Sequence, residues 1–317
     1  MSISFYIKNK KKFFGYEKVM KVREVIDLFK EYKLSFYNID FYTNDPNGEK
    51  FYNTSIENWQ ENHSCILFGV EGKSVRGFEF SYNTIKNSYV IREFTPASEN
   101  DWLIALKFMQ VLSEKLNSKI ISEQGNIFTF ETINTFDYKS DIKSGIKVIS
   151  DILNKENEKG FNVDNIYGIK RVVSFNKEII EKIVNSSDEI KEFSKFCEDI
   201  QYIKVYSAKQ SFVEDIVTKE KWGYYVLTEN LRTVLPYKPS VEFLSINYIK
   251  NEEIAFWKIF FCAYKINENG EEGIEKIGEL IYDDFIKKLP KEKYKFIDAS
   301  YIMVEPLTKE EISDFLK

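Results

Sequence analysis

The chain has 317 residues, of which 43% are hydrophobic, 16% are aromatic and 30% are charged. This composition excludes a disordered chain, because disordered chains lack the apolar surface that compensates for the entropy lost on folding. The formal net charge of −5 argues against a dedicated nucleic-acid-binding protein, which normally carries a basic surface.

The first hundred residues predict a strand, a short amphipathic helix and a strand meander. Residues 3–7 have strand composition, and residues 18–32 place apolar side chains at helical spacing. Three further runs, 65–71, 76–83 and 88–94, are strand-like, and the last two alternate along the chain. Because short turns join these runs, we predict an antiparallel meander.

The strongest helical pattern covers residues 98–117. Ser98 and Asp101 have the spacing of a capping box, with Asp in place of the usual Glu. The polar positions form one narrow stripe and the remaining girdle is apolar. We therefore expect a largely buried helix that lies across the sheet. A second helical stretch covers roughly 141–156.

The segment 153–165 is the predicted domain boundary, because it is charged and carries few large apolar residues. It divides the chain into an N-terminal lobe, 1–155, and a C-terminal lobe, 156–317. Most of the second lobe has strand composition, and a capping box at Thr308 begins a terminal helix. The strict alternation of strand and helix is missing. The predicted fold class is α+β, with mainly antiparallel sheets packed against a few amphipathic helices in two lobes.

The N-terminus lacks the apolar run and cleavage site of a signal peptide. The most apolar window, residues 254–266, is too short to cross a bilayer and contains Lys258. We therefore expect a cytoplasmic protein without a membrane partner.

Residue types exclude several kinds of chemistry. The single histidine, His63, rules out multi-histidine metal sites, and Cys65, Cys197 and Cys262 match no zinc or disulfide spacing. A Cys–His pair would need spatial proximity that the sequence does not predict. The glycines match no phosphate-binding loop. We expect no metal and no cofactor.

The segment LTENLRTVLPYKP and the strand before it form the predicted recognition surface. Its residues are Trp222, Tyr225, Arg232, Tyr237 and Lys238. Two prolines stiffen the chain around the last two, and Arg and Tyr are common anchors of interfaces. Tyr225 and its neighbour must point to opposite faces, so only one ring can be exposed. The alternative is an edge strand with a proline-interrupted corner.

Four stretches together resemble a known bacterial family. They are FYIKNKKKFFG, TPASENDWLIALKF, RTVLPYKP and FIDASYIMVEP. They resemble a family catalogued as a domain of unknown function, over most of the chain. The resemblance implies a bacterial, full-length, soluble protein without a signal sequence, and it carries over no activity and no site residue.

These observations favour a non-catalytic protein that binds another protein, as inhibitors of the immunity type do. An acidic binding protein is steered towards a basic partner. One alternative is an enzyme that acts on a small metabolite through dispersed acidic, Arg and Tyr groups. The other is a structural subunit of a cytoplasmic assembly. We expect no nucleic-acid partner, and the sequence leaves the oligomeric state open.

Overall fold

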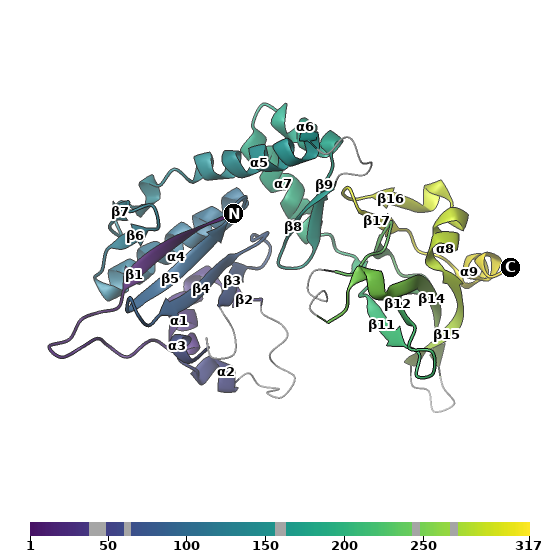
Figure 1. Cartoon of the computed structure of the whole chain (residues 1–317), viewed down its shortest axis with the longest axis horizontal. Helices are drawn as coiled ribbons and strands as arrows, with labels where there is room; N and C mark the ends of the chain where they lie inside the picture. Colours follow the sequence, from purple (N-terminus) through teal and green to yellow (C-terminus); the bar gives the residue numbers. More distant parts are fainter. Residues whose placement is uncertain (38–48, 60–64, 156–162, 243–247, 267–271) are drawn as a thin grey trace. The chain divides into compact units, whose positions relative to one another are not determined.

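The computed structural model describes residues 1–37, 49–59, 65–155, 163–242, 248–266 and 272–317. Within these ranges the chain forms two compact units, Met1–Tyr202 and Ile203–Lys317 (Figure 1). Helices and mostly antiparallel sheets make up both, so the α+β fold class predicted from the sequence is confirmed.

The first unit is built on a seven-stranded antiparallel sheet with the order β2-β3-β4-β5-β1-β6-β7. The strands are β1 (Ser2–Lys8), β2 (Leu34–Phe36), β3 (Ile66–Val70), β4 (Phe78–Asn83), β5 (Ser88–Phe94), β6 (Ile120–Ser122) and β7 (Ile127–Phe128). The meander predicted for 65–94 is confirmed as β3-β4-β5. The N-terminal strand β1 completes the centre of the sheet by pairing with both β5 and β6.

Helix α4 (Glu99–Leu116) packs across this sheet through aromatic contacts. The Phe108 ring lies 4.8 Å from Phe78 and 5.0 Å from Phe80, and Trp102 meets Phe5 edge-on at 6.3 Å. All five side chains are essentially buried. The helix is therefore largely buried, as its narrow polar stripe predicted.

The carboxylate of Asp101 connects the start of α4 to the β3–β4 turn. Its oxygens accept hydrogen bonds from Ser98 N (3.2 Å) and Ser98 Oγ (2.8 Å), which confirms the predicted capping box. They also accept from the backbone N–H groups of Val75 (3.0 Å), Arg76 (3.1 Å) and Gly77 (3.0 Å). Because Asp101 is fully buried, these bonds replace the water that a charged carboxylate would otherwise bind.

The rest of the first unit surrounds this core. It comprises α1 (Val22–Leu28), η1 (Lys30–Tyr32), α2 (Glu49–Asn53), α3 (Ile56–Trp59), η3 (Ile133–Thr135), α5 (Tyr138–Lys155), β8 (Asp164–Tyr167), β9 (Val172–Phe175), α6 (Lys177–Val184) and α7 (Glu189–Gln201). The hairpin β8–β9 and helices α5–α7 share one hydrophobic core with the seven-stranded sheet.

The unit division at Tyr202 lies later in the chain than the boundary predicted after residue 155. The reason is a set of bonds between residues 163–202 and the sheet and α4. Ile169 N donates to Val75 O (2.8 Å), and Glu99 N donates to Ser194 Oγ (2.9 Å). Residues 156–162, at the centre of the predicted boundary, lie outside the described residues.

The second unit contains two four-stranded sheets. One has the order β10-β13-β17-β16, and the other β11-β12-β14-β15. Their elements are β10 (Tyr206–Ser207), β11 (Ser211–Glu214), β12 (Lys221–Thr228), β13 (Thr233–Pro236), η5 (Asn251–Glu253), β14 (Ile254–Ile266), β15 (Glu272–Ile281), α8 (Tyr282–Lys288), η6 (Lys291–Lys293), β16 (Tyr294–Phe296), β17 (Tyr301–Val304) and α9 (Lys309–Phe315). Helix α9 begins at the capping box of Thr308 and Glu311, as predicted.

Helices α8 and α9 cover one face of the sheet β11-β12-β14-β15. Phe285 of α8 and Phe315 of α9 pack on Phe261 of β14, with ring centroids 5.7 and 6.2 Å away. Tyr282 Oη donates to Pro236 O (2.6 Å) and so links α8 to β13 of the other sheet. The core of the second unit therefore lies between its two sheets and these helices.

Replacing Asp101 with Asn should lower the free energy of unfolding by about 3 kcal/mol, measured by urea denaturation at pH 7. In Asn an NH2 group replaces one of the two carboxylate oxygens. The buried backbone N–H groups that bonded to that oxygen then lose their acceptor. The matched control is Asp188→Asn at the exposed N-cap of α7, where Asp accepts from Lys191 N. Asn and Asp cap equally well, so the control should stay near wild type. Equal effects of the two substitutions would contradict the anchoring role of Asp101.

Candidate functional site

Arg232, Tyr237 and Lys238 lie at the two ends of β13. This strand pairs with both β10 and β17, so it is an inner strand and not the edge strand of the alternative interpretation. The Arg232 guanidinium contacts Glu305 Oε2 at 2.5–2.8 Å in an exposed ion pair. Exposed pairs of this kind contribute about 0–1 kcal/mol.

Tyr237 is half-buried and its ring lies 4.9 Å from Phe296 and 6.0 Å from Tyr294, whereas Lys238 is exposed. Four residues of extended strand separate Arg232 from Tyr237, a distance of about 16 Å. The structure therefore does not bring the predicted arginine and tyrosine into one contact surface.

Trp222 and Tyr225 lie on opposite faces of β12. Tyr225 is only 1% exposed, stacks on Trp257 and accepts a hydrogen bond from Gln210 Nε2 (2.9 Å). It belongs to the core and offers no surface to a partner. Trp222 is half-buried on the face that α8 and α9 leave uncovered, and Tyr224 lies on the same face.

Four rings on this face form what we call the aromatic face: Trp222 and Tyr224 of β12, and Phe256 and Phe260 of β14. Tyr224 stacks on Phe260 with centroids 4.5 Å apart and planes at 21°, and Trp222 stacks on Phe256 at 5.9 Å and 13°. The rings thus stack on one another across the strands, so their faces are largely occupied.

Two lysines and one glutamate border the aromatic face. Lys258 Nζ lies 5.0 Å from the centre of the Trp222 ring, and Lys276 Nζ lies 3.7 Å from that of Phe260. Both ammonium groups bind Glu279, with Lys258 at 2.5 Å, and these hydrogen bonds lower the pKa of the Glu279 carboxyl. Two positive charges share one negative charge, so the border keeps an excess positive charge.

The sequence identified Trp222 and left open which of Tyr224 and Tyr225 is exposed, but it did not indicate Phe256 and Phe260. Strand periodicity places Phe256, Lys258 and Phe260 on one face, but the intervening Trp257 and Ile259 are also apolar. With apolar side chains on both faces, periodicity could not tell which face α8 and α9 would cover.

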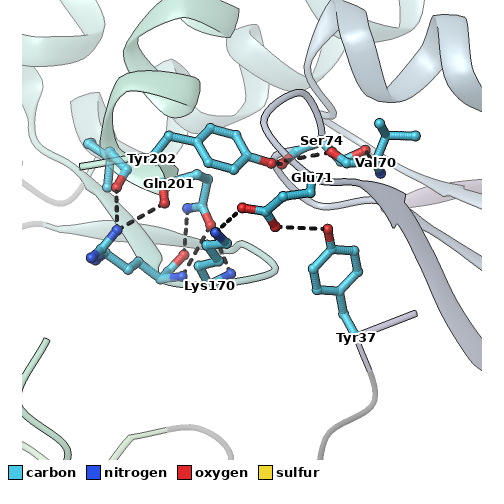
Figure 2. Close-up of polar contacts among 9 residues, drawn as sticks. Tyr37, Val70, Glu71, Ser74, Lys170, Gln201 and Tyr202 are labelled. Carbon is cyan, nitrogen blue, oxygen red and sulfur yellow. Dashed lines mark hydrogen bonds and ion pairs between the residues drawn. The ribbon is translucent and has the colours of Figure 1, made fainter. Parts of the chain in front are cut away.

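A cluster of polar side chains lies in the first unit, at the tip of the β8–β9 hairpin (Figure 2). We define the hairpin cluster as Tyr37, Glu71, Lys170, Gln201 and Tyr202. Lys170 Nζ forms an ion pair with Glu71, and Tyr37 Oη donates to the same carboxylate at 3.3 Å. Gln201 Oε1 accepts from Lys170 N at 2.9 Å.

These contacts dock the hairpin onto the β3–β4 turn. Tyr202 Oη donates to Ser74 O (2.6 Å), and Gln201 Nε2 donates to Arg171 O (2.7 Å). Burial, together with the charge of Glu71, raises the pKa of Tyr202 to about 12, so its hydroxyl stays protonated and donating. Each polar group of the hairpin cluster thus has a structural partner.

Glu93 is a fully buried acid on β5. Neither of its carboxyl oxygens has a hydrogen-bond partner in the part of the chain that the structure describes. Burial raises the pKa of Glu93 well above its usual value, and the negative charge of Asp101 raises it further, whereas the Arg76 guanidinium opposes the shift. Burial also raises the pKa values of Asp101 and Asp141.

No group of three or more His, Cys, Asp or Glu side chains that could hold a metal ion occurs among the described residues. His63 lies outside them, so the Cys–His pairing is not described. Cys197 is buried in the core of the first unit, and Cys262 is buried in the second. Across the same described ranges, no helix combines the length and the apolar character needed to cross a bilayer.

Glu93→Gln should stabilise the protein at neutral pH. The folded state holds a proton that the unfolded state releases above about pH 4.5, so the contribution of Glu93 to stability is greatest below that pH and falls as pH rises towards the pKa of folded Glu93. The difference in unfolding free energy between the Glu93→Gln variant and the wild type should grow by up to about 1.4 kcal/mol per pH unit. Urea denaturation from pH 4 to pH 8 measures it.

The control for this experiment is Glu123→Gln, at an exposed position. Its stability should follow the wild-type profile at every pH. If Glu93→Gln also ran parallel to the wild type, Glu93 would not be held in its neutral form.

Of three comparisons with known proteins, the one with family models gave a match and the other two gave none. Searches of curated proteins and of solved structures found no match. A family model described as a domain of unknown function, DUF4299, matches residues 2–315, nearly the full length of the chain. This match agrees with the resemblance of the four sequence stretches. The chain belongs to the DUF4299 family.

Proposed function

We propose that this protein is a bacterial cytoplasmic protein whose function is to bind another protein, and that the aromatic face is its contact surface. The observation that carries the proposal is the cluster of Trp222, Tyr224, Phe256 and Phe260 on a sheet face opposite α8 and α9. Trp and Tyr are enriched among the residues that dominate binding energy at interfaces.

The packing of the rings favours a protein over a nucleic acid. A nucleobase needs a free ring face on which to stack. Here the faces of Trp222 and Phe256 meet each other, and a lysine lies over Phe260. The ring edges and Lys258 fit an apolar patch of a protein that carries a carboxylate, which would take up the excess positive charge of the border.

More specifically, we propose that the protein is an inhibitor of the immunity type. The net charge of −5 supports long-range attraction to a basic protein, while the local contact joins the rings to an apolar patch and the lysine border to a carboxylate. A gene for a secreted toxin beside the gene for this protein would support this form.

Trp222→Ala should weaken partner binding by about 30-fold, the effect of a hot-spot residue. Partners captured by the full chain from native lysate are identified by mass spectrometry, purified and measured by calorimetry against wild type and variant. The melting temperature of each variant is measured as well. Trp222 is half-buried, so its replacement also removes packing contacts, and a loss of stability must be distinguished from a loss of binding.

The matched control is the double variant Arg232→Ala/Tyr237→Ala, which removes the predicted recognition residues of β13. It should bind the purified partner with wild-type affinity. Loss of binding in this variant, with retention in Trp222→Ala, would assign recognition to the ends of β13 and overturn the role of the aromatic face. If none of the captured proteins binds this protein after purification, the proposed function itself is overturned.

A further inference from the structure

The loop between β1 and α1 carries two solvent-exposed phenylalanines at its tip. Phe13 is 94% exposed and Phe14 is 86% exposed, and their rings pack edge-on with centroids 4.8 Å apart. Figure 1 shows this loop, in purple, extending away from the sheet. Because burial of a Phe side chain is favourable, an adjacent exposed pair at a loop tip indicates a surface that is covered in another state.

The backbone holds these rings at the tip. Lys11 pairs with Tyr16 in an antiparallel bridge, and Lys12 N donates to Gly15 O (3.0 Å). Gly15 has φ +78°, a left-handed conformation that glycine adopts without strain. The turn therefore presents Phe13 and Phe14 at its end.

The base of the loop is attached to the sheet. Asn9 is buried, its Nδ2 donates to Glu17 O (2.7 Å), and its backbone N donates to Asn87 O (2.9 Å). Residues 10–17 thus form a small hairpin with a fixed origin at the end of β1.

The β4–β5 turn lies at the same end of the sheet and carries a third exposed apolar side chain. Ile85 is 92% exposed. Its turn neighbours the loop because Lys8 pairs with Ser88 and Asn9 N bonds to Asn87 O. We call Phe13, Phe14 and Ile85, with the lysines around them, the tip surface.

The tip surface is strongly basic in an acidic protein. Its exposed lysines are Lys8, Lys10, Lys11, Lys12, Lys18 and Lys86. The loop from 9 to 21 contains one acid, Glu17, which pairs with Lys10 at 3.7 Å. This local charge has the opposite sign to the net charge of −5 of the whole chain.

We propose that the tip surface attaches the protein reversibly to an anionic lipid bilayer. Phe13, Phe14 and Ile85 enter the boundary between headgroups and acyl chains, and the lysines bind headgroup phosphates. Apolar insertion combined with a polybasic patch is the pairing that gives stable peripheral attachment. The inference goes beyond the proposed function and does not depend on the aromatic face. It replaces the expectation of no membrane partner, which considered only signal peptides and membrane-spanning segments.

Two features favour a bilayer over a nucleic acid or a protein. The Phe13 and Phe14 rings are at 83° to each other, so they offer no parallel platform for successive bases. The apolar groups, the Phe13–Phe14 pair and Ile85, project from two narrow turns, whereas a protein interface needs a broad packed patch.

A second exposed apolar pair in the chain provides the contrast. Ile216 and Val217 are 85% and 89% exposed, but their loop carries Glu214, Asp215 and Glu220 and a single lysine, Lys219, which pairs with Glu214. An anionic bilayer would repel this loop, so exposure of apolar residues alone does not lead to the same inference.

The test is sedimentation of the purified full chain with vesicles. Vesicles of phosphatidylcholine and phosphatidylglycerol should bind the protein, vesicles of phosphatidylcholine alone should not, and added salt should weaken binding. Phe13→Ser/Phe14→Ser should reduce the partition coefficient at least about tenfold, and so should Lys10→Gln/Lys11→Gln/Lys12→Gln. These residues are exposed, so both variants should keep the wild-type melting temperature.

The control variant is Ile216→Ser/Val217→Ser, which should bind the anionic vesicles like the wild type. The proposal is overturned if anionic vesicles do not bind the wild type, or if the serine variant at 13 and 14 binds as well as wild type. It is also overturned if single-stranded DNA binds the tip surface in place of vesicles. No partner protein enters this experiment, so its outcome is independent of the proposed function.

Discussion

The buried carboxylate of Asp101 is the contact on which the first unit depends. It accepts bonds from the backbone of the β3–β4 turn and from the cap of α4. The turn sets the register of β4 relative to β3, and the cap sets where α4 begins above the sheet. One side chain thus holds the two layers of the fold in place, and burial makes any missing hydrogen bond there costly.

The same turn receives the β8–β9 hairpin, and this explains why the first unit extends to Tyr202. Ile169 bonds to Val75, and Tyr202 bonds to Ser74, so the hairpin and the end of α7 attach directly beside the partners of Asp101. Composition marked residues 153–165 as a boundary because they are charged. Hydrogen bonds between distant segments decide the compact unit, and composition does not report them.

Two surfaces of the protein combine aromatic rings with lysines, but they differ in how the rings are used. On the aromatic face the rings stack on one another, and Glu279 neutralises part of the lysine charge. At the tip surface Phe13 and Phe14 are exposed to solvent, and the loop contains only one acidic residue, Glu17, that can pair with its lysines. The first arrangement suits a packed protein contact, and the second suits a deformable, anionic surface.

Local features of the fold could be predicted from the sequence alone. The β3-β4-β5 meander, the cap of α4 and the capping box of α9 depend on residues close together in the chain, so alternation and spacing were sufficient. Alternation also placed Tyr225 opposite its neighbour on β12. The tertiary structure decided that Tyr225 is the buried one and that β13 is an inner strand. Those outcomes depend on α8, α9, β10 and β17, which meet these strands only after the chain has folded back on itself.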